Sequence, residues 1–353
     1  MKAQREPNGK WKIQYRYNDY QGNVIKSTKR GFDTKREAEA WLREFLLTKH
    51  GDFNMRFEDF VKLYYEDMDK RLRENTMRTK KYIIDLKILP YFGKMRVNEI
   101  KPTDIRKWQN TLLAQNYSPT YIKTIQNQLT CLCNYAVRFY DLKANPCLKA
   151  GSIGSKNAQE MKFWVKQEFM QFIDSIMDKR QAWMGFMVLY WTGCRIGELL
   201  ALTVGDIDLD KRTISISKSF QRIDSRDVIT PPKTPKGNRI INIPEFLAID
   251  LQDYIGSIYG IEEEDRLFPF TKYFFEHEMQ RGVKLSGVKK IRLHDLRHSH
   301  CALLIDMGFT PIAIAERLGH ERIETTLGTY AHLFPNKQAQ MAERLDAEYK
   351  VDL

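Results

Sequence analysis

The second half of this 353-residue sequence carries a set of side chains that could act on a phosphate ester. The members of the set are Arg195, His294, Arg297, His320 and Tyr330. An arginine forms fork-shaped hydrogen bonds to phosphate oxygens that lysine cannot reproduce, and a histidine can hydrogen-bond the phosphate or carry a proton. A tyrosine hydroxyl can attack phosphorus. We interpret the set as a phosphoryl-transfer site whose nucleophile is a tyrosine.

A proton donor for the departing alkoxide is expected in a proline-rich stretch between the two arginines. Residues 231–237 read P-P-K-T-P-K-G and offer two lysines, Lys233 and Lys236. A lysine on such a loop can swing toward a bound phosphate. The residues alone leave the choice between the two lysines open.

Each member of the set stands in a short motif that is common in helical proteins. The motifs are T-G-C-R-I-G-E at 192–198, H-D-L-R-H at 294–298, L-G-H at 318–320 and T-Y-A-H at 329–332. An L-G-H sequence, for example, often does no more than end a helix at its C-cap glycine. The information therefore lies in the ordered combination of the motifs.

The charge of the chain indicates a polyanionic partner. Lys+Arg number 57 against 45 Asp+Glu, the formal net charge is +12, and basic residues occur in every segment. DNA or RNA fits this distribution better than an acidic membrane. An apolar run of 18 residues and a signal-type start are both absent, which predicts a protein without a membrane span. The five cysteines form no C-x-x-C pair, which favours a reducing cytoplasm over a disulfide or cysteine–zinc framework.

The first 50 residues predict a small sheet followed by a helix. Residues 11–17 alternate between apolar and polar side chains, as in a strand with one buried face, and 24–29 can return as a second strand. A capping box at 34–37 then begins a helix. The segment is basic, and its candidate DNA contacts are Arg16, Lys26, Lys29 and Arg30.

Residues 54–147 predict a domain of four helices. Apolar residues recur at helical spacing from Phe57, and the pattern is repeated before Pro90 by Tyr82, Ile83, Leu86 and Leu89. Basic side chains crowd the first connection between helices and recur on the last helix. The candidate nucleic-acid contacts are Arg78, Lys80, Lys81 and Lys123.

Residues 148–162 predict a linker, and 163–353 predict a domain of helices with a small β-system and a helical tail. Glycine, serine and asparagine are frequent in the linker. In the domain, 213–217 alternates as a strand, and we expect 226–230 to pair with 239–243 across the proline-rich loop. The chain as a whole is predicted to be multidomain and mainly α, with small β-sheets.

Taken in order, these motifs resemble those of the tyrosine recombinase (phage integrase) family. The similarity includes a K-T…R-x-I hairpin after the first arginine motif and covers residues 192–332, within what would be the family's α+β catalytic domain. Residues 54–147 resemble the family's helical core-binding (SAM-like) domain. Residues 1–50 resemble the sheet-plus-helix arm-binding module of lambda-type integrases from prophages and conjugative transposons. The resemblance therefore extends over nearly the whole chain.

The resemblance implies a role for each residue of the motifs. Arg195 and Arg297 would clamp the scissile phosphate, and Tyr330 would be the nucleophile. Lys233 would be the general acid, because K-T followed six residues later by arginine matches the family's hairpin. His294 would assist proton transfer.

Four other residues also stand at positions that match the family, and their implied roles are less direct. His320 stands where the family has histidine or tryptophan, and we count it among the catalytic residues. Glu198, the acidic residue after the first arginine, would orient its neighbours. His298 and His332 would be structural.

The implied activity is integration and excision of a mobile element. Cleavage and rejoining of double-stranded DNA attachment sites would pass through a 3′-phosphotyrosyl link, which stores the bond energy, so neither ATP nor a metal is required. The implied partners are a homotetramer on synapsed DNA, an excisionase and a host DNA-bending protein. The tail at 334–353 would dock on a neighbouring subunit or fold back on its own protomer.

Alternative functions make different predictions. A zinc hydrolase would use His294 and His298, which flank Asp295 in a pattern superficially like H-E-x-x-H, but it gives no role to the arginines or the tyrosine. A non-catalytic DNA-binding relative would be expected to lack at least one polar residue of the set. A Xer-like chromosome or plasmid resolvase generally lacks the N-terminal module, which favours a mobile-element integrase.

Overall fold

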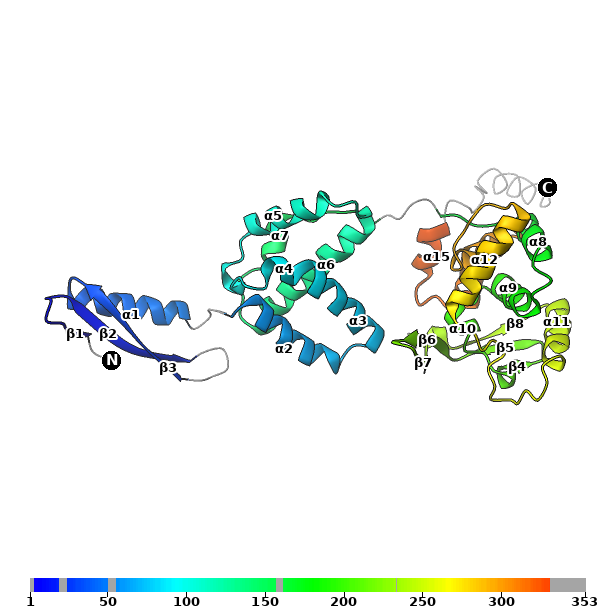
Figure 1. The fold of residues 1–353 in the computed structure, drawn as a ribbon, viewed down its shortest axis with the longest axis horizontal. Coiled ribbons are helices and arrows are strands. Elements are labelled where there is room, and N and C mark those ends of the chain that lie inside the picture. The colour runs from blue at the N-terminus through cyan, green and yellow to red at the C-terminus, as the bar shows by residue number, and fades with distance from the viewer. Residues whose placement is uncertain (1–2, 19–23, 50–54, 157–160, 233, 331–353) are drawn as a thin grey trace, which may run out of the picture. The chain divides into compact units, whose positions relative to one another are not determined.

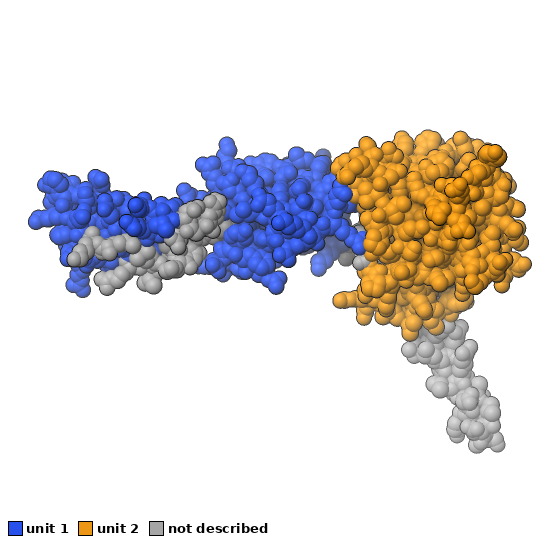
Figure 2. All heavy atoms as spheres, turned by 90° about the horizontal axis from the view of Figure 1, so that it is seen from below, with its two compact units in different colours: residues 1–159 blue, residues 160–353 orange. Residues whose placement is uncertain are grey.

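The computed structural model describes residues 3–18, 24–49, 55–156, 161–232 and 234–330. The chain separates into two compact units, Met1–Gln159 and Glu160–Leu353 (Figure 2). The first unit contains two separate hydrophobic clusters, one for the N-terminal module and one for the helical domain. The second unit contains every described residue of the predicted catalytic set. Among the described residues, no helix has the length and apolar character needed to cross a membrane.

The N-terminal module is an antiparallel sheet with a helix packed on one face, as predicted (Figure 1). Ile13 and Tyr15 are buried against Ala38 and Leu42 of the helix, which explains the alternating pattern. The hydroxyl of Thr34 accepts from the backbone N–H three residues later at 3.1 Å and so begins the helix. The elements, with strand order β1-β2-β3, are β1 (Ala3–Arg5), β2 (Trp11–Asn18), β3 (Val24–Phe32) and α1 (Lys35–Lys49).

The helical domain is built around a second cluster of buried side chains that includes Phe60, Trp108 and Leu129. Its last helix, α7, contributes Ala150 to this cluster, so the domain boundary predicted at 147 falls inside a packed helix. The helices are α2 (Phe57–Asp69), α3 (Glu74–Ile83), the π-helical turn Ile84–Ile88, α4 (Leu89–Phe92), the 3-10 turn Val97–Glu99, α5 (Pro102–Leu113), α6 (Pro119–Phe139) and α7 (Pro146–Ala150).

The buried face between α3 and α4 differs in part from the prediction. Ile83 is buried as predicted, whereas Tyr82 and Leu86 are 59 % and 52 % exposed, so the prediction is wrong for these two residues. Ile84 and Ile88 are fully buried instead. Ile84 and Ile88 are four residues apart, as are residues on one face of an ordinary helix. The buried side of this segment therefore keeps helical spacing, but it is rotated from the face that includes Tyr82 and Leu86.

The second unit is a helical bundle with small sheets (Figure 1). Its core is centred on α9, in which nearly every residue from Ala182 to Tyr190 is buried. The helices are α8 (Lys166–Asp174), α9 (Arg180–Thr192), α10 (Ile196–Leu199), α11 (Glu245–Gly256), α12 (Lys272–Ser286), α13 (Asp295–Asp306), α14 (Pro311–Leu318) and α15 (Ile323–Tyr330). The strands are β4 (Ile207–Asp208), β5 (Thr213–Ile216), β6 (Ser219–Ile223), β7 (Arg226–Thr230) and β8 (Arg239–Asn242).

The strand pairing in this unit differs from the prediction that 226–230 pairs with 239–243. β7 pairs with its predecessor β6, and β8 pairs with β5 in a sheet of order β4-β5-β8. Asp224 and Ser225 both have positive φ, 47° and 65°, which suits a tight two-residue hairpin turn. This local turn closes the β6–β7 hairpin and leaves β8 to bury Ile241 beside Ile214 of β5.

Candidate active site

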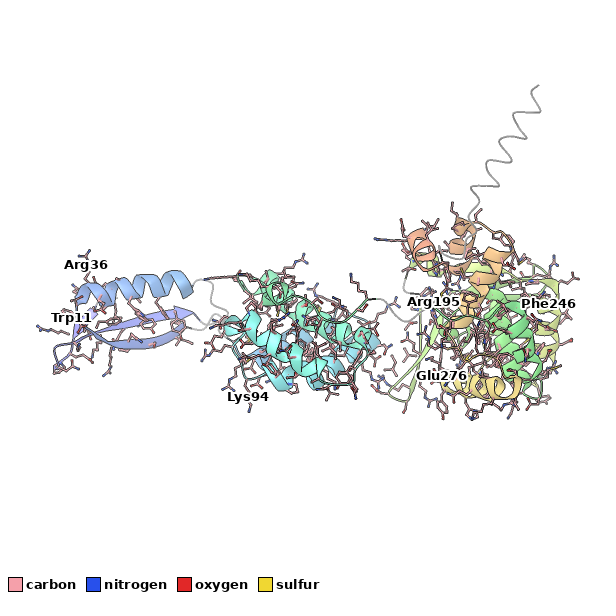
Figure 3. The ribbon with its side chains drawn as sticks, turned by 90° about the horizontal axis from the view of Figure 1, so that it is seen from above. Trp11, Arg36, Lys94, Arg195, Phe246 and Glu276 are labelled. Atoms are coloured by element: carbon pink, nitrogen blue, oxygen red, sulfur yellow. The ribbon has the colours of Figure 1, made fainter. Side chains whose placement is uncertain are left out.

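Arg195 connects the end of α9 to the start of α10. Gly193 ends α9 in the left-handed conformation, with φ of 67°, and Arg195 then takes the N-cap position of α10. Its Nη1 donates to Oε1 of Glu198 at 2.8 Å, and its backbone N–H donates to Oε2 at 2.9 Å. The side chain of Arg195, labelled in Figure 3, keeps 42 % of its surface exposed. The first arginine is thus oriented by an acidic neighbour and accessible to a ligand.

Arg297 lies in the first turn of α13 and is almost completely buried, at 3 % exposure. Its Nη1 donates to the carbonyl oxygen of Gly193 at 2.8 Å, and its Nη2 donates to that of Leu318 at 2.6 Å. These carbonyls end α9 and α14, where backbone oxygens lack helical partners and the helix dipole is negative. Burial and the charge of Arg195 lower the pKa of Arg297 to about 9, so this side chain remains positively charged at pH 7.

A buried ion-pair network links Arg195 to the strand β8. Glu198 is 4 % exposed and accepts from Nη2 of Arg239 at 2.9 Å as well as from Arg195. Arg239 also donates to the carbonyl oxygen of Arg317, near the end of α14, at 3.0 Å. Burial acts to raise the pKa of Glu198, but the hydrogen bond and charge of Arg239, with the charge of Arg195, outweigh burial and lower it. The orienting role expected for Glu198 fits this position between two arginines.

The loop between β7 and β8 lies against the L-G-H segment. Gly319 ends α14 with φ of 67°, and a Cβ there would stand 2.7 Å from the carbonyl oxygen of Lys236 and 3.0 Å from Cδ of Arg239. Glycine therefore permits this close approach. Lys236 belongs to the 3-10 turn Pro235–Gly237 and is exposed. Lys233, the expected general acid, lies outside the described residues, so the choice between the two lysines stays a prediction.

Tyr330 ends the described part of α15 with its side chain buried. It is 2 % exposed and packs in a small hydrophobic cluster with Cys301, Ile305 and Leu318. Its hydroxyl lies 2.5 Å from Nδ1 of His298. Burial raises the pKa of Tyr330 well above the ordinary value for a phenol, so the hydroxyl is protonated at neutral pH. His332 and the tail at 334–353 lie outside the described residues.

The two histidines of the predicted set, His294 and His320, share one electrostatic environment with His298. Burial lowers the pKa of His294, and it lowers the pKa values of His298 and His320 to about 4, with the charges of nearby arginines adding to the effect. The rings of His294 and His298 meet edge to face with centroids 5.2 Å apart. Nδ1 of His320 lies 2.7 Å from the hydroxyl oxygen of Thr326 on α15. Neutral imidazoles can each offer one donor and one acceptor to a bound phosphate or hydroxyl.

His298, for which the family resemblance implies a structural role, contacts the candidate nucleophile. It follows His294 by one helical turn, and this spacing was the available signal that both rings share a face of α13. The tyrosine that completes the contact lies 32 positions later in the chain. Arg239 was likewise expected only as a marker of the lysine loop, yet it is the main ion-pair partner of Glu198.

The surroundings of the H-D-L-R-H motif do not support a zinc site. Asp295 accepts from the backbone N–H of Arg292 at 2.8 Å and from its Nη2 at 2.8 Å. Nδ1 of His298 is occupied by the Tyr330 hydroxyl. Across the part of the chain that the structure describes, no group of three or more His, Cys, Asp or Glu side chains is arranged to hold a metal ion.

The candidate DNA contacts of the N-terminal module occupy both faces of its sheet. Arg16 pairs with Lys26 across β2 and β3, and both side chains are exposed on the face away from α1. Lys29 stands on the face that α1 covers, and its Nζ lies 5.8 Å from the ring centroid of Trp41. Arg30 is exposed and forms an ion pair at 3.3 Å with a glutamate before β2.

The candidate DNA contacts of the helical domain lie at its surface, and the three lysines among them also contact neighbouring side chains. Lys80 and Lys81 of α3 each hold Nζ 5.6 Å from the ring of a tyrosine on α2. Lys123 of α6 donates at 2.5 Å to a serine hydroxyl in the segment after α7. Arg78 of α3 is exposed. These side chains are therefore available to contact a polyanion without being buried in the core.

Comparison with known protein families gives matches along most of the chain. Residues 4–49 match the Arm DNA-binding domain. Residues 56–113 match the phage integrase N-terminal SAM-like domain. Residues 161–337 match the phage integrase family, and this segment contains the described catalytic set.

Individual relatives agree with these matches. The chain is similar to the ICEBs1 integrase of Bacillus subtilis, with 33 % identity over 304 residues, or 82 % of each chain. It is also similar to the transposase from transposon Tn916 of Enterococcus faecalis, with 26 % identity over 305 residues, 79 % of this chain and 74 % of that one.

Solved structures share the fold. The Tn1549 transposon integrase in complex with a circular intermediate DNA superposes with a TM-score of 0.68 at 22 % identity, over 81 % of this chain and 99 % of that chain. The lambda integrase dimer bound to a COC′ core site gives a TM-score of 0.61 at 14 % identity, over 93 % of this chain and 94 % of that chain.

Proposed function

Because the chain belongs to the tyrosine recombinase (phage integrase) family and performs site-specific recombination on DNA, we propose a specific division of roles among its residues. Arg195 and Arg297 hold the scissile phosphodiester, and Tyr330 attacks its phosphorus. The observation that carries this assignment is the convergence on α13. Arg297 binds the carbonyls that end α9 and α14, and the next residue, His298, contacts the tyrosine hydroxyl. Motifs that lie far apart in the sequence thus meet at one helix.

The proposed reaction exchanges one phosphate ester for another. The phenol oxygen of Tyr330 bonds to phosphorus, and the bond from phosphorus to the 5′ oxygen of the next nucleotide breaks. The phenol loses its proton, and a donor protonates the departing 5′ oxygen, a role for which Lys233 is our candidate. Attack by a 5′-hydroxyl of another strand reverses these events and seals the DNA. The phosphotyrosyl link conserves the bond energy between the two steps.

Electrostatics support a phosphate site between the two arginines. The charge of Arg195 lowers the pKa of Arg297, which shows that the two cations repel each other. A phosphodiester anion between them would relieve this repulsion, and the guanidinium forks would stabilise the charge that builds on the non-bridging oxygens. His294 is exposed and His320 is half-buried, and as neutral imidazoles beside the arginines they complete the set as hydrogen-bond donors and proton carriers.

We propose two further DNA contacts outside the catalytic unit. The exposed face of β2 and β3 carries Arg16 and Lys26 on a two-stranded ribbon, a shape that a major groove admits, with Arg30 alongside. Lys29 is expected to contribute less because its ammonium group lies against Trp41. In the helical domain, the phosphate contacts are assigned to Arg78, Lys80, Lys81 and Lys123.

The proposed working assembly is a homotetramer on two synapsed duplexes in the cytoplasm. Each duplex must be cut on both strands, so exchange between two duplexes requires four nucleophiles. The lambda integrase, which shares this fold, is described as a dimer bound to a COC′ core site. The match of residues 4–49 to an arm-binding domain favours a mobile-element integrase over a Xer-like resolvase. An excisionase and a host DNA-bending protein complete the proposed partners.

A nicked suicide duplex tests the reaction directly. The duplex carries sequence from beside the gene, where an integrase gene normally keeps its attachment site, and the nick lets the cleaved fragment diffuse away. We expect the wild type to form a covalent protein–DNA adduct that survives SDS, and Tyr330→Phe to form none. The adduct should form in excess EDTA, which separates this chemistry from that of a zinc hydrolase. An adduct in the Tyr330→Phe variant would overturn the assignment of the nucleophile.

A further inference from the structure

The contact between His298 and Tyr330 is the closest polar contact that the structure gives the nucleophile's hydroxyl. The oxygen lies 2.5 Å from Nδ1, and the two ring centroids are 5.5 Å apart with an interplanar angle of 59°. His298 belongs to α13, whereas Tyr330 ends the described part of α15. The contact therefore fixes the nucleophile to the helix that carries the phosphate-binding Arg297.

The chemistry of the neighbours determines the direction of this hydrogen bond. The tyrosine is 2 % exposed, and a buried hydroxyl requires a partner for its proton. Its other polar neighbour is the thiol of Cys301, which is a weak acceptor. Burial and the adjacent His294 keep His298 neutral at pH 7, so Nδ1 can accept while Nε2 carries the ring proton. The phenol therefore donates to Nδ1.

We propose that His298 is a positioning residue for the nucleophile, holding the Tyr330 hydroxyl by accepting its proton in a hydrogen bond. The inference rests on the proposed function, since it gives this contact a purpose only if Tyr330 attacks phosphorus. With its proton directed at Nδ1, the phenol oxygen keeps its lone pairs free to approach the phosphate. Arg297 and His298 are adjacent in α13, so one helix sets both the phosphate and the attacking oxygen.

Paired substitutions at this position separate a hydrogen bond from mere packing. His298→Asn keeps an acceptor close to the position of Nδ1, whereas His298→Phe keeps a ring of similar size without an acceptor. Cys301→Ala is the matched control, because it removes the other polar neighbour of the hydroxyl and leaves the histidine. Thermal unfolding and DNA affinity are measured for each variant alongside the single-turnover cleavage rate on the suicide duplex.

We expect His298→Phe to cleave about 100-fold more slowly than the wild type, the cost of a misaimed reacting group. We expect His298→Asn to recover to within about tenfold of the wild type, and Cys301→Ala to remain close to it. DNA affinity should be unchanged in all three. Cleavage by His298→Phe at the wild-type rate would overturn the inference. Equal losses in His298→Phe and His298→Asn would also overturn it, because an acceptor would then not suffice.

A modified substrate tests whether the loss in His298→Phe arises at the nucleophile or at the leaving group. Replacing the scissile 5′ bridging oxygen by sulfur creates a leaving group that needs no proton donor. We expect the loss in His298→Phe to persist on this duplex, since the defect lies in the nucleophile. Restoration of its rate by sulfur would show that His298 serves the leaving group and would overturn the inference. Absence of any adduct with the wild type would instead overturn the proposed function, and this inference with it.

Discussion

The two arginines proposed to hold the phosphate occupy opposite environments. Arg195 is 42 % exposed and has a carboxylate, Glu198, as its partner. Arg297 is 3 % exposed and donates to the neutral backbone carbonyls of Gly193 and Leu318. Glu198 is buried but keeps Arg239 as a second partner, so the exposed Arg195 is expected to contribute little to stability. A buried arginine that satisfies backbone carbonyls contributes through every hydrogen bond it makes.

Because of this difference in environment, we expect a change at Arg195 to affect phosphate binding and a change at Arg297 to affect folding as well. Arg195 can be changed with little effect on the core, because Glu198 retains Arg239 as its second partner. Arg297 joins the ends of α9 and α14 to the start of α13, so its loss leaves two buried carbonyls without donors. Under the proposed roles, the same chemical group would serve as a ligand-binding residue at one position and as a structural residue with a catalytic role at the other.

The largest effect is expected for Arg297→Ala. This change should abolish detectable adduct formation and lower the free energy of unfolding of the catalytic unit by about 3 kcal/mol, because two charge-assisted hydrogen bonds are lost in a buried place. Urea denaturation measures the stability and the suicide duplex measures cleavage. Arg212→Ala is the control, since the side chain of that arginine is 53 % exposed and its partner, Glu245, is exposed as well. Equal stabilities for the two variants would remove the proposed contrast.

A smaller total effect, confined to catalysis, is expected for Arg195→Lys. The charge remains but the fork-shaped pair of hydrogen bonds is lost, so cleavage should fall about 100- to 1000-fold. DNA affinity should be retained, and the free energy of unfolding should change by less than about 0.5 kcal/mol. Arg212→Lys, an exposed arginine beside Glu245, serves as control and should cleave normally. A loss of stability as large as that of Arg297→Ala would contradict the comparison.

The smallest effect concerns the acid sensitivity of the buried side of the site. His320 has a pKa of about 4 in the folded state, below the ordinary value of about 6.5 in an unfolded chain. The unfolded state therefore binds more protons between these values, and stability falls as pH drops from about 6.5 toward 4. For a half-buried ring we expect roughly 0.5–1 kcal/mol per pH unit. His320→Gln should reduce this slope in urea denaturation at pH 7, 6 and 5, and an unchanged slope would refute the prediction.

Local patterns in the sequence predicted the elements better than the contacts between them. The alternation around Ile13 and the Thr34 cap specify the N-terminal module because strand and helix periodicity depend on neighbours in the chain. The predicted apolar face failed at Tyr82 because Ile84 and Ile88, which have the same helical spacing, take the buried side instead. The pairing of β7 failed because a two-residue turn at Asp224 closed a shorter hairpin.

Within the site, the order of the motifs predicted candidate residues but not the groups that these residues contact. The arginine at 297 is evident from H-D-L-R-H, yet its carbonyl ligands become visible only when α9 and α14 are brought to it. The contact of His298 with a tyrosine 32 positions later could not be read from helical spacing, which relates residues three or four apart. Tertiary packing, which linear patterns do not encode, supplies this information.

The attachment of Arg297 to the ends of α9 and α14 bears on the safety of the host chromosome. A molecule in which either helix end has unfolded loses one of the carbonyls that hold the guanidinium. Under the proposed roles, such a molecule would also lose the geometry of the phosphate clamp and would be unable to break a strand. Strand breakage would then be restricted to molecules in which α9, α13 and α14 are folded together.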